Sequence, residues 1–249
     1  MSWMGKILGG GLGFMMGGPI GMVVGAVIGD HTIDSEGGGQ LSGLETRQTV
    51  YFVATFSMLA KLARADGRVT EQEIAVIDRV MRENLRLPAQ ARELAIRIFN
   101  EAKQSSQTFE DFARQFYTEF SRAPEVLASV LDLLLLVAMS DGNLHAAEER
   151  LLKSAARIFG IDHQYEQLKS RYVPAAADNI DRCYKILGAE PGDSLAVIKK
   201  KYRKLAMDFH PDRVQSQGMP PELAQAAEER FKEIRHAWDI LEKHLGSKA

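Results

Sequence analysis

The chain has almost no cysteine. Cys183 is the single cysteine among 249 residues, so no disulfide can form within the chain and a disulfide-stabilised scaffold is excluded. The six histidines do not combine with it into a set that has metal-ligand spacing, and no glycine-rich loop is followed by the Lys-Ser or Lys-Thr of a phosphate-binding motif. We therefore expect no catalytic residues, no cofactor and no enzymatic activity.

An excess of charge of one sign is also missing. The chain has 31 Lys and Arg against 33 Asp and Glu, a formal net charge of −2. No overall basic field is available to attract nucleic acid. No aromatic platform on which bases could stack accompanies the one basic patch, around Lys199 to Lys204, where Tyr202 is the single aromatic residue. We expect no nucleic-acid partner.

Alternation of apolar and polar residues with the period of a strand is absent. Apolar residues instead recur at helical spacing, as at Ile74, Ile77, Val80 and Met81. The prediction is an all-α protein with an N-terminal transmembrane helix, a helical middle domain and a C-terminal helical hairpin. The expected ranges are an anchor at 1–29, a Gly- and Ser-rich linker at 30–44, the middle domain at 45–172, a short linker at 173–179 and the C-terminal domain at 180–249.

The segment from Ile7 to Gly29 has 23 residues and no charged side chain. As a helix it would be about 34 Å long, enough for a hydrocarbon core of about 30 Å. Small residues on one helical face let two backbones pack closely in lipid, so we predict a homodimer through this stripe. The alternatives are a signal peptide, a disordered glycine-rich tail, and a re-entrant hairpin broken at Gly17, Gly18 and Pro19. The glycines of the stripe recur at every fourth position: Gly9, Gly13, Gly17, Gly21, Gly25 and Gly29.

An Asp-Gly pattern occurs twice in the middle domain, 75 residues apart. One interpretation is a helix that ends at Asp-Gly, followed by an acidic first turn of the next helix. The other is a metal site, with Asp66, Glu71 and Glu73 or with Asp141, His145 and Glu148 as ligands; the best candidates are Asp66, Glu73, Asp141 and Glu148. An EF-hand is excluded, because the alternating oxygen ligands are missing. The pattern resembles the TerB-like family, which is associated with membrane-linked stress responses including tellurite resistance.

The C-terminal domain has two apolar stripes at helical spacing. Residues 195–209 have Ile198, Tyr202, Leu205 and Phe209 on one stripe, and a later segment has a second stripe at Phe231, Ile234, Trp238 and Leu241. The two helices should pack as an antiparallel hairpin. Five basic residues between 199 and 204 then point to solvent against Asp208 alone, a local charge of +4 that suits an acidic protein partner.

Pro211 disfavours helical geometry at His210, so the first helix must stop there. This arrangement resembles the J-domain family: the Tyr184, Ile186, Leu187, Gly188 opening, Ser194 before the basic helix, and the His210-Pro211-Asp212 loop all occur in order. The resemblance implies that the domain binds an Hsp70 partner and stimulates its ATPase. The stretch from Val214 to Arg230 departs from the family pattern and should lengthen either the loop or the last helix. The contact residues implied are His210, Pro211, Asp212, Lys199, Tyr202, Arg203, Lys204 and Arg213.

The order of anchor, TerB-like domain and J-domain resembles the membrane-anchored bacterial DnaJ-like proteins. This resemblance implies a co-chaperone of a DnaK-type Hsp70 at the inner membrane. Lys6 alone would weakly place the N-terminus in the cytoplasm; because Hsp70 and ATP are cytoplasmic, we predict instead one crossing and a cytoplasmic location for everything after Asp30. Substrates should bind to the middle domain, since the zinc-binding cysteines of general DnaJ proteins are missing. The alternative function is a scaffold that senses metal or envelope stress through that domain.

Overall fold

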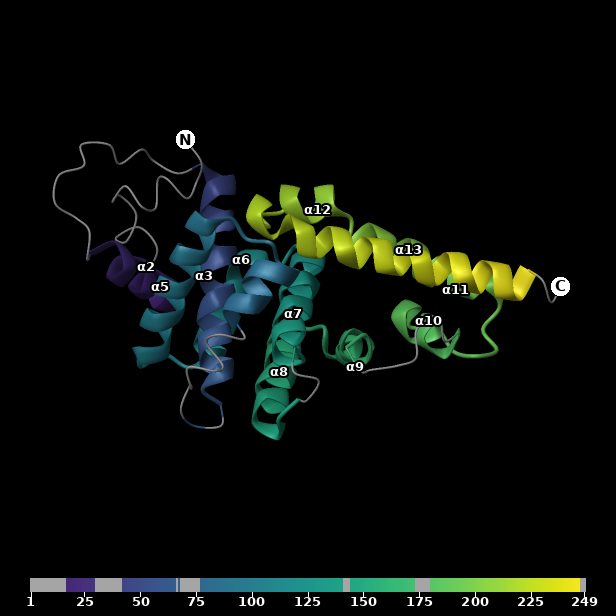
Figure 1. Cartoon of the computed structure of the whole chain (residues 1–249), viewed down its shortest axis with the longest axis horizontal. Coiled ribbons are helices and arrows are strands. Elements are labelled where there is room, and N and C mark those ends of the chain that lie inside the picture. Colours follow the sequence, from purple (N-terminus) through teal and green to yellow (C-terminus); the bar gives the residue numbers. More distant parts are fainter. Residues whose placement is uncertain are drawn as a thin grey trace.

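The computed structural model describes residues 17–29, 42–65, 67, 77–140, 144–172 and 180–246, and this part of the chain is helical without strands. The helices form two packed groups that meet beside α7 (Figure 1). The first group contains α2 (Gly18–Gly29), α3 (Gly43–Ala63), a π-helical turn (Val80–Asn84), α5 (Ala89–Gln104), α6 (Phe109–Phe120), α7 (Pro124–Ala138), α8 (Ala146–Ile158) and α9 (Asp162–Ser170). The second contains α10 (Ile180–Leu187), α11 (Leu195–Asp208), α12 (Pro211–Ser216), a 3-10 turn (Pro221–Leu223) and α13 (Ala224–Gly246).

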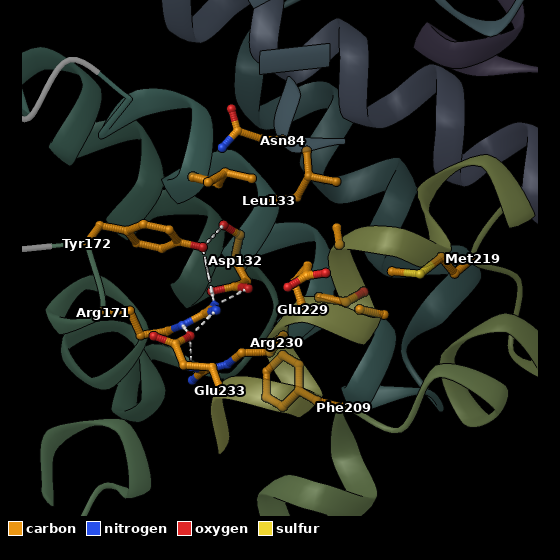
Figure 2. A pocket seen from close by; sticks show the side chains of 14 residues that line it. Asn84, Asp132, Leu133, Arg171, Tyr172, Phe209, Met219, Glu229, Arg230 and Glu233 are labelled. Carbon is orange, nitrogen blue, oxygen red and sulfur yellow. Dashed lines mark hydrogen bonds and ion pairs between the residues drawn. The ribbon is translucent and has the colours of Figure 1, made fainter. Parts of the chain in front are cut away.

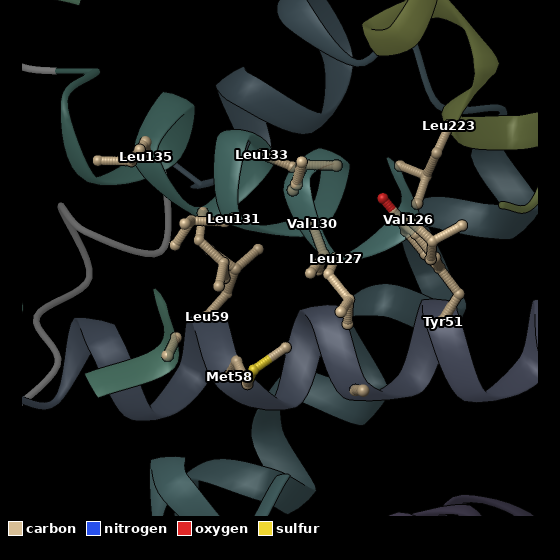
Figure 3. Close-up of a cluster of buried hydrophobic side chains, with 14 of the residues drawn as sticks. Tyr51, Met58, Leu59, Val126, Leu127, Val130, Leu131, Leu133, Leu135 and Leu223 are labelled. Atoms are coloured by element: carbon tan, nitrogen blue, oxygen red, sulfur yellow. The ribbon is translucent and has the colours of Figure 1, made fainter. Parts of the chain in front are cut away.

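Helix α3 is at the centre of the first group. It begins two residues before the range expected for the middle domain, because Ser42 and Glu45 form a capping box that satisfies backbone N–H groups at its start. Its residues from Gln48 to Ala60 are all buried, and the helix packs against α2, α5, α6, α7 and α8. The apolar run in α7 is buried against it; in Figure 3, Leu127 and Leu131 of α7 lie above Met58 and Leu59 of α3.

Helix α2 differs from the uninterrupted helix expected for residues 7–29. Gly17 is not helical, Gly18 has a positive φ of 79°, and Pro19 lies in the first turn. A left-handed glycine followed by proline starts a new helix instead of continuing an earlier one. The resulting helix of 12 residues is about 18 Å long. None of the helices in the described ranges is both long and apolar enough to cross a bilayer; Ile7 to Met16 are outside those ranges.

The second group is built on a hairpin of α11 and α13, with α10 packed against α13. Ser194 caps α11 by accepting a hydrogen bond from the backbone N–H of Val197. The two predicted stripes meet inside the hairpin. Ile198 and Ile234 are fully buried there, and the rings of Tyr202 and Trp238 stack with their centroids 5.0 Å apart.

The two groups are docked together through the stretch that departs from the family pattern. This stretch forms α12, the 3-10 turn and the first turns of α13, and α12 packs against α7. Met219 and Leu223 are buried, and Leu223 points toward Val126 of α7 and Tyr51 of α3 in Figure 3. Gly218 has φ of 117° and lies so close to α3 that an added Cβ would be 2.8 Å from Cβ of Arg47. The stretch therefore supplies the start of α13 and packs the hairpin against the middle domain.

Candidate functional site

His210, Pro211 and Asp212 lie at the junction between α11 and α12. Helix α11 ends at Asp208, and His210 has the extended geometry (φ −65°, ψ 126°) that a following proline favours. Pro211 then occupies the first turn of α12, where its missing N–H has no consequence. The sequence predicts that the first helix stops before a loop with a restricted arrangement; in the structure the tripeptide is a corner between two helices.

The side chains of this corner face solvent. His210 and Asp212 have side-chain exposures of 47% and 91%, and Nδ1 of His210 is 4.0 Å from Oδ2 of Asp212. The imidazole is held edge to face against Phe231 of α13, with ring centroids 5.2 Å apart. Phe231 therefore orients His210 from the neighbouring helix while both polar ends of the corner stay open to a partner.

Helix α11 presents a basic face beside this corner. Lys199, Lys200, Arg203 and Lys204 are exposed as predicted. Lys201 instead forms an ion pair with Asp193, at 2.8 Å, which lowers the pKa of that carboxyl through the hydrogen bond from the ammonium. Tyr202 is half-buried in its stack on Trp238, so only part of its ring is available to a partner.

Arg213 is the predicted contact residue that is bonded to the middle domain in the described part of the chain. Its Nε donates to Oε1 of Glu125 at the start of α7, at 3.2 Å. Glu125 has a side-chain exposure of only 3%, and its other carboxylate oxygen has no hydrogen-bond partner in the described part of the chain. Burial raises the pKa of the neighbouring Asp208, against the opposing effects of Lys204 and Arg213. One edge of the site is thus formed by the middle domain.

A buried ionic cluster joins the two helical groups (Figure 2). Arg171, which follows α9, donates to both carboxylate oxygens of Asp132 on α7 and to Oε2 of Glu233 on α13, the latter from Nη2 at 2.6 Å. The hydroxyl of Tyr172 also donates to Asp132. Burial alone would lower the pKa of Arg171, but Asp132, Tyr172 and Glu233 together raise it. The pKa of Glu233 is lowered, because Arg171 and Arg230 outweigh the opposing effect of its burial.

Arg230 completes the cluster from α13. Its side chain is 1% exposed, donates from Nη1 to Glu233 at 3.2 Å and lies over the ring of Phe209 at 5.1 Å. Burial, followed by repulsion from Arg171, lowers its pKa to about 10, which leaves it charged at neutral pH. Its Nε and Nη2 have no hydrogen-bond partner among the described residues, and Arg230 is one of the residues that line a cavity of about 290 Å³ between the two groups. Such a cavity can supply ordered water to an otherwise incompletely bonded guanidinium.

This cluster was not predicted from the sequence, although two of its residues stand out there. Asp132 interrupts an otherwise apolar run, and Arg230 takes a core position between Ala227 and Ile234 on α13. A charge at a buried position requires a partner. The sequence is therefore enough to predict a buried charge at both positions. It does not identify their partners, because these depend on how the two helical groups pack together.

The metal interpretation gains no support from the described residues. Asp66, Glu73 and Asp141 lie outside them. Glu148 accepts a hydrogen bond from the backbone N–H of His145, which closes the start of α8. Within the described ranges no three His, Cys, Asp or Glu side chains gather closely enough to hold a metal ion. For Glu148 the capping interpretation of the Asp-Gly pattern therefore fits the structure.

The glycine stripe is described only in part. Gly9 and Gly13 lie outside the described residues. Gly17, Gly21, Gly25 and Gly29 are at the start of or within α2, which packs against α3, α5 and α6 of the same chain. Gly17 and Gly25 have open space where a Cβ would be. Dimerisation through the stripe stays a prediction.

Comparisons with known proteins agree with this architecture. The family model of the DnaJ domain matches residues 182–245, that of the tellurite resistance protein TerB matches 52–169, and that of the co-chaperone DjlA transmembrane domain matches 1–46. The co-chaperone protein DjlA of Yersinia pseudotuberculosis is 30% identical over 283 residues that cover 100% of both chains. The chain belongs to the DjlA co-chaperone family.

Other members of the DjlA family match over nearly the same length. The co-chaperone protein DjlA of Coxiella burnetii is 30% identical and that of Photobacterium profundum 29% identical, with coverage of 98% or more of each chain. No solved structure shows a significant match. The resemblances to the J-domain and TerB-like families are confirmed, and the match to the DjlA transmembrane domain supports a membrane anchor within the first 46 residues.

Proposed function

We propose that this chain is a membrane-anchored co-chaperone that recruits a DnaK-type Hsp70 to the membrane and stimulates its ATPase. The observation that carries the proposal is the exposed His210-Pro211-Asp212 corner beside the basic face of α11, within a DnaJ domain. The proposed role is regulatory, without catalytic residues or a cofactor of its own.

The residues of the site contribute to binding of the partner in different ways. Lys199, Arg203 and Lys204 supply an exposed positive surface that speeds and orients the encounter with an acidic surface of Hsp70. His210 and Asp212 supply directional polar groups at the corner. Pro211 and Phe231 reduce the entropy that is lost on binding, because they hold that corner in one conformation before the partner arrives.

The anchor sets where this activity takes place. We propose a single crossing of the inner membrane, with the bulk of the chain in the cytoplasm, where Hsp70 and ATP are found. A homodimer through the glycine stripe would bring two J-domains to one membrane site. Exchange of Gly21 for Ile in the full-length chain, followed by measurement of the oligomeric state in detergent, tests the stripe; a dimer that persists would contradict it.

The function is tested by single-turnover ATP hydrolysis by a DnaK-type Hsp70 in the presence of the detergent-solubilised full chain. We expect the wild type to accelerate hydrolysis and His210→Gln to abolish the acceleration, because the glutamine cannot reproduce the contact with Phe231. His163→Gln on the exposed surface of α9 is the matched control and should behave as the wild type. Absence of acceleration by folded wild-type protein would refute the proposal.

A metal- or stress-sensing scaffold is the alternative function. The match to the tellurite resistance protein TerB concerns the domain and names no ligand. No observation on the described residues favours this alternative over the co-chaperone function.

A further inference from the structure

Helix α2 occupies an apolar groove on the middle domain. Ile20, Val23, Val24 and Val27 are all between 0% and 4% exposed, and α2 packs against α3, α5 and α6. These four residues stand at positions i, i+3, i+4 and i+7 of the helix. That spacing is typical of a helix bound in a groove through one apolar face.

The groove also recognises the backbone of its occupant. Gln115 of α6 donates from Nε2 to the carbonyl oxygen of Gly17 at 2.7 Å and accepts through Oε1 from the backbone N–H of Ile20 at 2.8 Å. The N–H of Ile20 is one of the donors at the start of α2 that have no acceptor within the helix, and the carbonyl of Gly17 lies just before the helix. Any polypeptide that starts a helix here offers the same groups, whereas a lipid chain does not.

A hollow of about 330 Å³ lies beside α2, between Met22, Val23 and Ala26 on one side and the polar residues Glu101, Gln104, Ser105, Ser106 and Gln107 on the other. Met22 is 53% exposed, so this hollow is at the solvent-facing edge of the groove. A longer side chain at the position of Ala26 would extend into it.

The same residues belong to the segment that matches the DjlA transmembrane domain. A helix that is embedded in lipid cannot also fill the groove, so insertion of this segment into a membrane uncovers the apolar faces of α3, α5 and α6. We propose that the uncovered groove binds apolar helix-forming segments of non-native polypeptides, and that α2 occupies it as a substitute ligand away from the membrane. The proposal rests on the membrane anchor of the family and does not depend on Hsp70 stimulation.

The probe is a fluorescent peptide that contains residues 17–29 with lysines added at both ends for solubility. Its binding to the full chain in phospholipid nanodiscs is measured by fluorescence anisotropy, with bare nanodiscs as the blank. We expect saturable binding to the wild type. Gln115→Ala should weaken it about tenfold, because two backbone hydrogen bonds are lost, and Thr118→Ala on the exposed face of α6 should leave it unchanged. A peptide with the same composition but without the i, i+3, i+4, i+7 spacing should not bind.

Two further measurements locate the peptide-binding site and test whether non-native polypeptides bind there. A photoreactive group at the position of Val23 in the peptide should crosslink to α3, α5 or α6, and a permanently unfolded reduced protein should displace the peptide. The proposal is overturned if the peptide does not saturate, if Gln115→Ala binds it equally well, if crosslinks fall on the J-domain, or if unfolded protein does not compete. The assay contains neither Hsp70 nor ATP, so its failure is distinct from failure of the proposed function.

Discussion

At the scale of single residues, the molecule contains an ionic cluster that is unusual for its depth of burial. Arg171 has a side-chain exposure of 9% and forms ion pairs with two carboxylates that belong to different helical groups. A buried ion pair contributes little net stability when it is complete, because desolvation offsets the attraction. Removal of one partner is different, since it leaves a buried charge without compensation.

Replacement of Arg171 by Met should therefore lower the free energy of unfolding by about 3 to 5 kcal/mol. The loss arises because Asp132 loses its main cationic partner inside the interface. Urea unfolding followed by circular dichroism measures it. Arg114→Met is the control, because the exposed pair of Arg114 with Asp111 contributes less than about 1 kcal/mol. Equal losses in the two variants would contradict this account of the cluster.

The cluster also makes stability depend on pH. The pKa of Glu233 is lower in the folded chain than its ordinary value, through Arg171 and Arg230 and against the effect of burial. Its contribution is therefore fully present above the unfolded pKa of about 4.3 and is lost as the pH falls through the folded pKa. We expect Glu233→Gln to reduce the dependence of the urea midpoint on pH below about 5. An unchanged slope in this variant would show that other carboxylates account for acid sensitivity.

At the scale of elements, Gly218 controls the contact between the J-domain and the middle domain. Gly218 has φ of 117°, and Gly192 has a similar φ of 114°. Unlike Gly218, Gly192 has open space where a Cβ would be. Gly192→Ala should cost about 1 to 2 kcal/mol from backbone strain alone. Gly218→Ala should cost about 1 to 3 kcal/mol more, because its Cβ would collide with Arg47 and Phe120.

Thermal unfolding of the two glycine variants measures this difference, and the Gly192 variant serves as the control for strain. A similar decrease in both unfolding temperatures would mean that the contact between the J-domain and the middle domain opens at little cost in free energy. A larger decrease for Gly218→Ala would place the interface within the cooperative unit of folding.

The sequence predicted most elements of this fold because local rules determine them. The helices of the hairpin follow from apolar spacing, the start of α11 from Ser194, and its end from Pro211. The break before α2 was foreseen only as an alternative, at Gly17, Gly18 and Pro19, because charge and length alone favoured one long helix. The docking of the two groups could not be predicted, since Arg171 and Glu233 are 62 residues apart and nothing local specifies their pairing.

At the scale of the whole molecule, the middle domain contacts one of the residues that the proposed function assigns to the Hsp70 partner. The family resemblance assigns Arg213 to the contact with Hsp70, yet its Nε donates to Glu125 of α7 in this structure. On the proposed function, a partner that needs the Nε group of Arg213 must displace Glu125. The middle domain would then oppose full engagement of the corner, although His210 and Asp212 are exposed.

Glu125→Gln should make the chain a more effective co-chaperone, because glutamine keeps the shape of the side chain and removes the charge that holds Arg213. A charge-assisted contact at a partly exposed arginine is worth about 0.5 to 1 kcal/mol, so the concentration needed for half-maximal stimulation of Hsp70 should fall about two- to fivefold. Glu119→Gln, which removes the surface partner of Arg47, should leave this concentration unchanged. A rise for Glu125→Gln would mean that Glu125 helps to present Arg213 to Hsp70, and the middle domain would then be part of the binding site instead of a competitor for it.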